Sequence, residues 1–166
     1  PTGITLAVIS VNNETCDELN NGSATVSATG GTGPYDFTWI RISTLSVIQT
    51  DLNVAAGILG ALSTATGLSA TTYLVTVTDD NGCTAVETVV IDQPTNLIAT
   101  IIATTDETCP ANNDGMATVV ATGGTPGYSY LWSNGDNTVL ADNLMSGVLY
   151  TVQVTDINGC TATTTA

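Results

Sequence analysis

The sequence contains no histidine and no lysine, and Arg41 is its one cationic side chain. Without histidine the commonest general base is missing, and so are the Ser-His-Asp and Cys-His arrangements and most zinc sites. Without cations the chain cannot replace the counterions on phosphate, which excludes DNA, RNA and an anionic membrane surface as partners. We therefore expect neither an enzyme nor a nucleic-acid-binding protein.

Long apolar runs are also missing. No stretch of about 18 apolar residues is present, so we expect no membrane insertion. The sequence shows no signal peptide and opens on Pro1 without methionine, which suggests a mature chain or an excerpt. Its net charge of −14 favours solubility, repulsion between copies or the attraction of divalent cations.

Residues that favour surface helices are scarce, because lysine is missing and glutamate occurs only at positions 14, 18, 87 and 107. The hydrophobic fraction is 43%, enough for packed cores, and consists mostly of valine, isoleucine, leucine and alanine. Threonine is frequent. β-Branched residues fit a pleated sheet, so the composition predicts an all-β protein.

Two stretches of the sequence recur almost unchanged. VTDDNGC at 77–83 returns as VTDINGC at 154–160, and NETC at 13–16 returns as DETC at 106–109. Such self-similarity indicates two copies of one structural unit. We place the modules at residues 1–93 and 94–166.

The first copy is the longer one. Trp39 and Trp132 lie 93 positions apart, whereas Tyr73 and Tyr150 lie only 77 apart. The difference between these offsets, 93 − 77, is an insertion of 16 residues in the first copy. It lies between Trp39 and Tyr73.

Apolar and polar residues alternate along three segments of each module, which indicates strands with one buried face. The aromatic residues fall on the predicted buried face, which argues against an exposed carbohydrate-binding platform. This pattern is typical of a small immunoglobulin-like sandwich with a tryptophan in its core. The expected core residues are Ala24, Val26, Ala28, Tyr35, Phe37, Trp39, Tyr73, Val75 and Val77, with Ala117, Val119, Ala121, Tyr128, Tyr130, Trp132, Tyr150, Val152 and Val154 as their counterparts.

Each recurring phrase contains a turn signal. The NG pairs at 81–82 and 158–159 favour a hairpin with positive φ. Asp79 and Asp156 are placed to accept hydrogen bonds from the turn backbone. The phrase therefore repeats because both modules need the same final hairpin.

The order of the motifs resembles the SprB-type repeat. The resemblance is closest in GGTPGYSYLWSNG at 123–135 and VQVTDINGC at 152–160, whereas the first module lacks SNG after Trp39. SprB-type repeats are similar to PKD and immunoglobulin-like modules. They occur in large cell-surface adhesins of gliding and related Bacteroidota, which the type IX system exports. The resemblance implies two tandem immunoglobulin-like (PKD-like) β-sandwich modules outside the cell.

No cluster of side chains identifies a reaction, so the expected function follows from architecture and resemblance. We expect a non-enzymatic structural or adhesive protein, with tandem modules of a bacterial surface adhesin or fibre. Its partners would be neighbouring copies of the module or chain, and surface polysaccharide or other cell-surface material. Two alternatives are a self-assembling extracellular filament subunit and a calcium- or glycan-binding accessory module of a secreted protein.

Acidic turns offer a candidate metal site. Calcium needs about six to eight oxygen ligands, usually including several carboxylates. The candidates are Asp79, Asp80, Asp92, Asp114 and Asp156. Each turn supplies few carboxylates and no EF-hand spacing is present, so hydrogen bonding within turns is the competing explanation. We expect no cofactor and at most a small dependence on calcium.

The insertion contains VIQTDLNVAAGILGALSTATG at 47–67, which is apolar and carries no charge after Asp51. Exposed apolar patches usually mark contacts, so we expect this segment to pack against another module or chain. An extra hairpin folded onto its own module is the alternative. The expected interface residues are Val47, Ile48, Leu52, Val54, Ile58, Leu59 and Leu62.

The four cysteines form no CxxC pair and predict disulfides formed in an oxidising, extracytoplasmic setting. We expect one disulfide in each module, Cys16–Cys83 and Cys109–Cys160. An alternative arises because, in immunoglobulin topology, the loop after the first strand and the last hairpin lie at opposite ends of a sandwich. Cys16 would then bond to Cys160, and Cys83 and Cys109 would bond to outer neighbours in a longer array.

Overall fold

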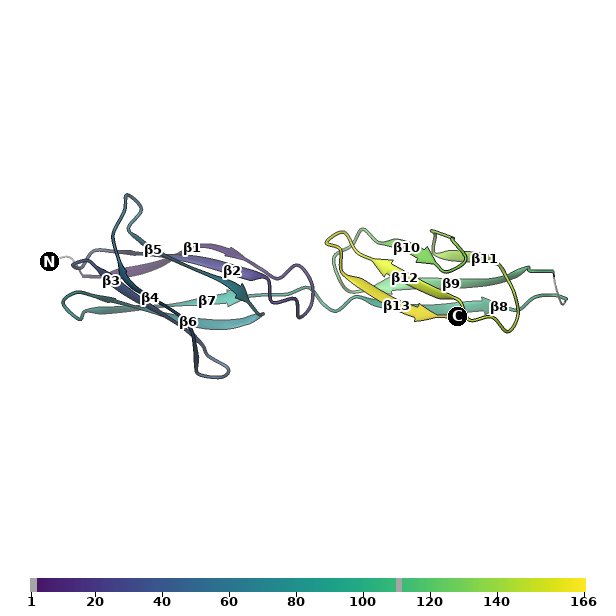
Figure 1. The fold of residues 1–166 in the computed structure, drawn as a ribbon, viewed down its shortest axis with the longest axis horizontal. Helices are drawn as coiled ribbons and strands as arrows, with labels where there is room; N and C mark the ends of the chain where they lie inside the picture. Colours follow the sequence, from purple (N-terminus) through teal and green to yellow (C-terminus); the bar gives the residue numbers. More distant parts are fainter. Residues whose placement is uncertain (1–2, 110–111) are drawn as a thin grey trace. The chain divides into compact units, whose positions relative to one another are not determined.

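The computed structural model describes residues 3–109 and 112–166. The chain divides into two compact units, Pro1–Gln93 and Pro94–Ala166, called unit 1 and unit 2 below. The described residues form strands and turns without a helix, and neighbouring strands pair antiparallel (Figure 1). The all-β prediction is therefore confirmed. No helix in this part of the chain could cross a membrane.

Unit 1 is a sandwich of two sheets. Both sheets are antiparallel, and the second has one strand more than the first. The first sheet has the order β1-β2-β5, and the second has the order β4-β3-β6-β7. The strands are β1 (Thr5–Asn12), β2 (Gly22–Thr29), β3 (Tyr35–Arg41), β4 (Ser46–Val54), β5 (Ala61–Leu68), β6 (Thr71–Asp79) and β7 (Thr84–Ile91).

Unit 2 repeats this arrangement with one strand fewer. Its sheets have the orders β11-β9-β8 and β10-β12-β13. The strand without a counterpart is β4, so the insertion adds an edge strand beside β3, where unit 2 has none. The strands of unit 2 are β8 (Ile98–Thr105), β9 (Gly115–Thr122), β10 (Ser129–Trp132), β11 (Leu140–Leu144), β12 (Thr151–Thr155) and β13 (Thr161–Thr165).

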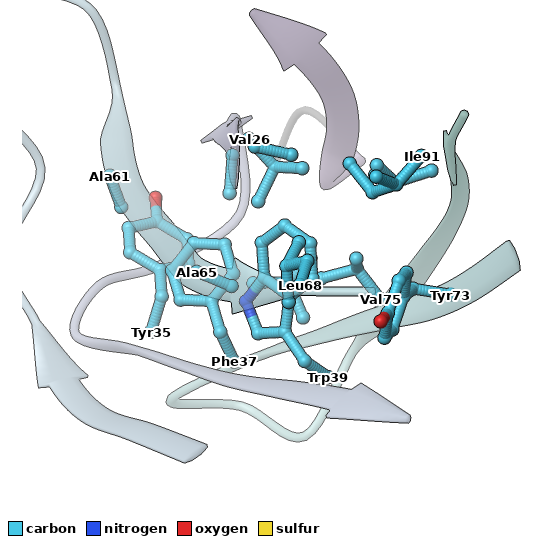
Figure 2. Close-up of a cluster of buried hydrophobic side chains, with 14 residues drawn as sticks. Val26, Tyr35, Phe37, Trp39, Ala61, Ala65, Leu68, Tyr73, Val75 and Ile91 are labelled. Carbon is cyan, nitrogen blue, oxygen red and sulfur yellow. The ribbon is translucent and has the colours of Figure 1, made fainter. Parts of the chain in front are cut away.

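The core of unit 1 lies between its two sheets. β3 alternates along its length, and the rings of Tyr35, Phe37 and Trp39 point to the same side of the strand (Figure 2). Phe37 and Trp39 are each 0% exposed. The facing sheet contributes small and branched side chains, such as Val26 and Ala65, that leave room for the rings. The nine residues predicted for this core are all buried.

The core of unit 2 is built in the same way but is less completely covered. Trp132 is buried, whereas Ala121, Tyr128 and Tyr130 are only partly buried and pack against the core. β10 is an edge strand of its sheet, while its counterpart β3 is flanked by β4 and β6. The missing edge strand accounts for the greater exposure of the tyrosines in unit 2.

Candidate functional site

The hairpin between β6 and β7 is held by the carboxylate of Asp79, the last residue of β6. Its Oδ1 accepts hydrogen bonds from the backbone N–H groups of Asn81, at 3.0 Å, and Cys83, at 2.8 Å. Gly82 supplies the positive φ, 80°, that the NG pair predicted. The predicted role of Asp79 in the turn is confirmed. We call residues 79–83 and their counterparts 156–160 the aspartate turns.

Asp79 also holds a second loop, which the sequence did not predict. Its Oδ2 accepts a hydrogen bond from the backbone N–H of Thr32 at 3.0 Å, and Asn81 Nδ2 donates to Thr32 Oγ1 at 2.9 Å. Gly31 has a φ of 66°, and a Cβ there would lie 2.7 Å from Asp79 Oδ2. The GGT motif (residues 30–32 in unit 1) and the VTDxNGC phrase therefore recur together because hydrogen bonds join them.

Unit 2 repeats these contacts. Asp156 Oδ1 accepts from the backbone N–H groups of Asn158 and Cys160, both at 2.9 Å, and Oδ2 accepts from the N–H of Thr125 at 2.8 Å. A Cβ on Gly124 would lie 2.8 Å from Asp156 Oδ2. The predicted hydrogen bonding of this turn is likewise confirmed.

The aspartate turns shift the ionisation of their carboxyl groups. Burial raises the pKa of Asp79, but the N–H groups of Thr32, Cys83 and Asn81 outweigh burial and leave the pKa below its ordinary value. The N–H of Thr125 is the largest cause of the lowered pKa of Asp156. Backbone donors bind only the charged form of each carboxylate well, so both aspartates are structural anions at neutral pH.

The other candidate calcium ligands lie apart. Asp80 and Asp92 are exposed. Asp114 accepts hydrogen bonds from the Thr108 N–H at 2.9 Å and from the Thr108 hydroxyl at 2.6 Å, and this hydroxyl is the largest cause of its lowered pKa. Across residues 3–109 and 112–166, no three cysteine, aspartate or glutamate side chains are grouped to hold a metal ion. Calcium binding stays a prediction.

The cysteines differ from the expected pairing. Cys83 and Cys109 are free thiols on the surface, so neither of them is bonded to Cys16 or to Cys160. The predicted bonds Cys16–Cys83 and Cys109–Cys160 are therefore wrong. Each module has one cysteine in the loop after its first strand and one in its aspartate turn, and these two do not bond within the module.

Distance explains this difference in unit 1. Cys16 lies two residues after Glu14, whose N–H donates to the carbonyl of Asp92, just beyond the end of β7. Cys83 comes immediately before the start of β7. A strand of 8 residues, β7, separates the two places, and at roughly 3.3 Å per residue it spans about 26 Å. A disulfide requires Cα atoms within about 7 Å.

The insertion forms β4 and the loop that leads into β5. Val54 is partly buried and packs against the core of its own unit, and its place in the predicted interface stays a prediction. The other six residues of the predicted interface are exposed, and Ile58, Leu59 and Leu52 are the most exposed, at 104%, 68% and 64%. We call these six exposed residues the inserted apolar edge; they are Val47, Ile48, Leu52, Ile58, Leu59 and Leu62.

The insertion also completes a polar network that the sequence did not reveal. The Trp39 indole donates to Ser63 Oγ at 2.7 Å, and Ser63 Oγ donates to Asp51 Oδ2 at 2.5 Å. Gln49 Nε2 donates to both oxygens of Asp51. In unit 2 the Trp132 indole donates instead to a backbone carbonyl, that of Thr138, at 3.0 Å.

Unit 2 contains a pocket of about 260 Å³ at the end opposite its aspartate turn. Its lining comes from four separate segments, which is why no sequence motif predicted it. Glu107 and Tyr150 provide polar atoms, and Met116 and Met145 provide apolar surface. The Glu107 carboxylate accepts a hydrogen bond from the N–H of Ser146, so it closes the loop before β12.

One family model matches part of each unit. The model of the SprB repeat matches residues 8–44 and 101–137. Both matches begin within the first strand of a unit, β1 or β8, and end beyond the strand that contains the tryptophan, β3 or β10. They therefore cover equivalent parts of the two sandwiches. A comparison with curated proteins gives no match.

Some of the solved structures similar to this chain are described as immunoglobulin domains or fibronectin(III)-like modules. The crystal structure of DIP-gamma IG1+IG2 is 13% identical, with 96% of this chain and 94% of that chain covered and a TM-score of 0.48. A 282-residue C-terminal fragment of intimin, in complex with the intimin-binding domain of its translocated receptor, is 16% identical, with coverages of 96% and 63% and a TM-score of 0.44.

The fibronectin(III)-like modules of Clostridium thermocellum CbhA are 14% identical to this chain. They cover 97% of it and 91% of their own length, with a TM-score of 0.35. The two matches to the SprB model fall one in each sandwich, and the recurring motifs predicted the same repeat. The two matches are consistent with two tandem copies of the SprB repeat.

Proposed function

We propose that this chain is a non-enzymatic structural protein of the cell exterior, whose modules act in series within a bacterial surface adhesin or fibre. The observation that carries the proposal is the SprB repeat, which occurs twice in tandem with the same internal contacts. Repeat modules of this adhesin type serve to extend a chain and to present surfaces. Their function follows from repetition rather than from one reactive site.

The path of the chain through each unit supports this role. In unit 1 the chain enters beside the aspartate turn, where Ile4 lies against Gly31, and leaves at Asp92, beyond the far end of β7. In unit 2, Leu97 lies beside Gly124, and Ala166 pairs with Tyr150 at the other end of β12. A module whose ends lie at opposite poles adds length when it is repeated.

The chemistry of the buried polar groups is consistent with a structural role. The carboxylates of Asp79 and Asp156 are bound by backbone N–H groups, which keeps them ionised and directs their acceptor oxygens to the fold. A general acid or base needs a pKa near the working pH, whereas the pKa of both groups is lowered. The sequence contains no histidine to take that role.

Export by the type IX system, service in gliding motility and contact with surface polysaccharide are the finer parts of this proposal. They rest on the SprB repeat and on the exposed surfaces of the modules. A fibre that self-assembles is the second candidate function, and the inserted apolar edge favours it because exposed apolar surface of this kind usually marks a contact.

Labelling of intact cells tests the proposal. An antibody against residues 94–166 should label unpermeabilised cells, and brief treatment with an external protease should remove the signal. Deletion of the coding region should reduce attachment to glass or to polysaccharide-coated beads by several fold. Labelling that appears only after permeabilisation would show that the chain is not a surface protein.

A further inference from the structure

The pocket of unit 2 corresponds to the place that Ile91, the last residue of β7, fills in unit 1. We propose that this pocket is a docking site for a branched aliphatic side chain, carried by an extended segment that continues β13 two positions beyond Ala166. The occupant is the segment that leads out of the module, as Ile91 does in unit 1. This inference rests on the serial arrangement proposed above and describes how each module of a series is completed.

Ile91 closes one end of the core of unit 1. It is 1% exposed, and Figure 2 shows it among the side chains of that core. A Cβ on Gly22 would lie 2.6 Å from Ile91 Cγ2, so the glycine leaves the room that this side chain fills. Val90, one position earlier on the same strand, is exposed. The alternation of β7 therefore directs Ile91 inward.

Gly115 provides the same room in unit 2. A Cβ on Gly22 would lie 2.8 Å from the carbonyl oxygen of Leu68, and a Cβ on Gly115 would lie 2.7 Å from that of Leu144. Each leucine is the pairing partner of its glycine in the neighbouring strand. Gly115 and Leu144 both line the pocket. The pocket is therefore bounded by the same backbone groups that surround Ile91.

The pairing of the last two strands gives the position of the occupant. In unit 1, Ile91 lies two positions after Val89, which pairs with Tyr73. In unit 2, Ala166 takes the place of Val89, because it exchanges backbone hydrogen bonds of 2.8 and 2.9 Å with Tyr150. Tyr150 and Ala166 both line the pocket. A residue two positions farther along the strand would therefore reach it, and its backbone would extend the pairing with β12.

The acidic side chain at the pocket already serves the fold. Both carboxylate oxygens of Glu107 accept hydrogen bonds from backbone N–H groups. Glu14, its counterpart in unit 1, likewise accepts from two backbone N–H groups and is buried. These donors satisfy the carboxylate, so it requires no cationic occupant. Met116 and Met145 offer apolar surface that suits an aliphatic side chain.

Three full-length chains test the docking site. They are the wild type, the chain extended after Ala166 by Val-Ile-Asp, which is the sequence of residues 90–92, and the chain extended by Val-Ser-Asp as the matched control. The isoleucine extension should raise the melting temperature of unit 2 by roughly 5–15 °C, because it buries an aliphatic side chain in a small domain. The serine extension should bring a much smaller rise, from backbone pairing alone.

The methionines provide a readout at the pocket itself. The chain has 2 methionines, and both Met116 and Met145 line the pocket, so labelled methionine methyl groups report on this site by NMR. We expect cross-peaks between the methionine methyl groups and those of the added isoleucine. The same methyl signals, followed on heating, give the melting temperature of unit 2.

Equal melting temperatures for the two extensions would overturn the proposal, as would a spectrum of the isoleucine extension without these cross-peaks. Titration of the wild type with choline tests the competing occupant. Methionine shifts with millimolar choline, together with no effect of the isoleucine extension, would assign the pocket to an organic cation instead. Each of these results leaves the cell-labelling test of surface function unaffected, because that test does not depend on the pocket.

Discussion

Gly31 shows how one missing side chain lets two loops meet. Its neighbour Thr32 donates an N–H to Asp79 Oδ2, and a Cβ at residue 31 would come within 2.7 Å of that oxygen. Its φ of 66° is also one that side chains rarely adopt. Both the conformation and the space at this position therefore require glycine.

A pair of alanine substitutions separates these two effects. Gly82 also has a positive φ, but a Cβ there would meet nothing within 4 Å. Gly82→Ala should lower the free energy of unfolding by about 1–2 kcal/mol, from backbone strain alone. Gly31→Ala should lower the free energy of unfolding by a further amount of about 1–3 kcal/mol, because the added methyl group would also crowd the Asp79 carboxylate.

Urea unfolding of unit 1, followed by the fluorescence of Trp39 in a Trp132→Phe background, measures both costs. Equal losses of unfolding free energy in Gly31→Ala and Gly82→Ala would show that the aspartate turn accommodates the added methyl group at no cost. The corresponding substitution Gly124→Ala in unit 2 provides an independent repeat of the test.

The pKa values of Asp79, Asp114 and Asp156 predict how acid acts on the protein. Each is lowered in the folded state by hydrogen bonds from backbone or hydroxyl groups. A lowered carboxyl pKa contributes stability that is fully present above the ordinary aspartate pKa, about 4, and is lost as the pH falls through the folded value. We therefore expect constant stability from these groups near neutral pH and a decline below about pH 4.

Thermal melts between pH 7 and pH 2 test this sign. The variant with both Asp79→Asn and Asp156→Asn should melt several degrees lower than the wild type at pH 7. Its melting temperature should also fall less than that of the wild type on acidification. Asp36→Asn is the control, because the Asp36 carboxylate accepts from a single backbone N–H, that of Asn53. A parallel acid decline in the wild type and the double variant would contradict the assigned role of the aspartate turns.

At the scale of strands, alternation along the sequence predicted the cores well. The inward positions of β2, β3 and β6 are buried as expected, because a period of two places every second side chain on one face. Alternation gives no information about which loop lies beside which turn. The hydrogen bond between Thr32 and Asp79, which are 47 positions apart, could therefore not be predicted.

The cysteine pairing failed for a related reason. One cysteine of each kind in each module suggested self-contained disulfides, although immunoglobulin topology places the two loops at opposite ends of a sandwich. The sequence also did not show how many strands the insertion forms. Asp51 and Gln49 read as ordinary polar residues in the sequence, although they complete the hydrogen bonding of Trp39 through Ser63.

The inserted apolar edge leads to a prediction about association. Ile58→Ser together with Leu59→Ser should reduce self-association, since both side chains are exposed and would lose only intermolecular contacts. The free energy of unfolding should change by less than about 0.5 kcal/mol, as is usual for surface substitutions. Sedimentation velocity under reducing conditions measures association without any contribution from disulfides.

Leu131→Ser is the matched control for this experiment, because Leu131 is an exposed leucine in β10 of unit 2, outside the insertion. An equal effect of this control would mean that general surface hydrophobicity drives association. If the insertion variant associates as strongly as the wild type, the segment serves only to cover β3 and the core of unit 1.

At the scale of the whole molecule, the net charge of −14 on 166 residues is the dominant electrostatic feature. Copies of the chain repel one another at low ionic strength, and salt weakens this repulsion once the Debye length falls to about 10 Å near 0.1 M. Any joining of copies must overcome this repulsion. Divalent cations would favour it simply by screening, without a specific site.

Calcium therefore has to be compared with magnesium at equal ionic strength. We expect both cations to raise the melting temperature by a similar few degrees, and chelation to reverse the effect. The reason is that Asp79 and Asp156 already bond backbone N–H groups, while Asp80 and Asp92 remain exposed and separate. A drop of more than about 10 °C on removal of calcium alone would imply several kcal/mol of metal-coupled stability. Such a result would show that the acidic turns form a specific calcium site, because screening does not distinguish two cations of equal charge.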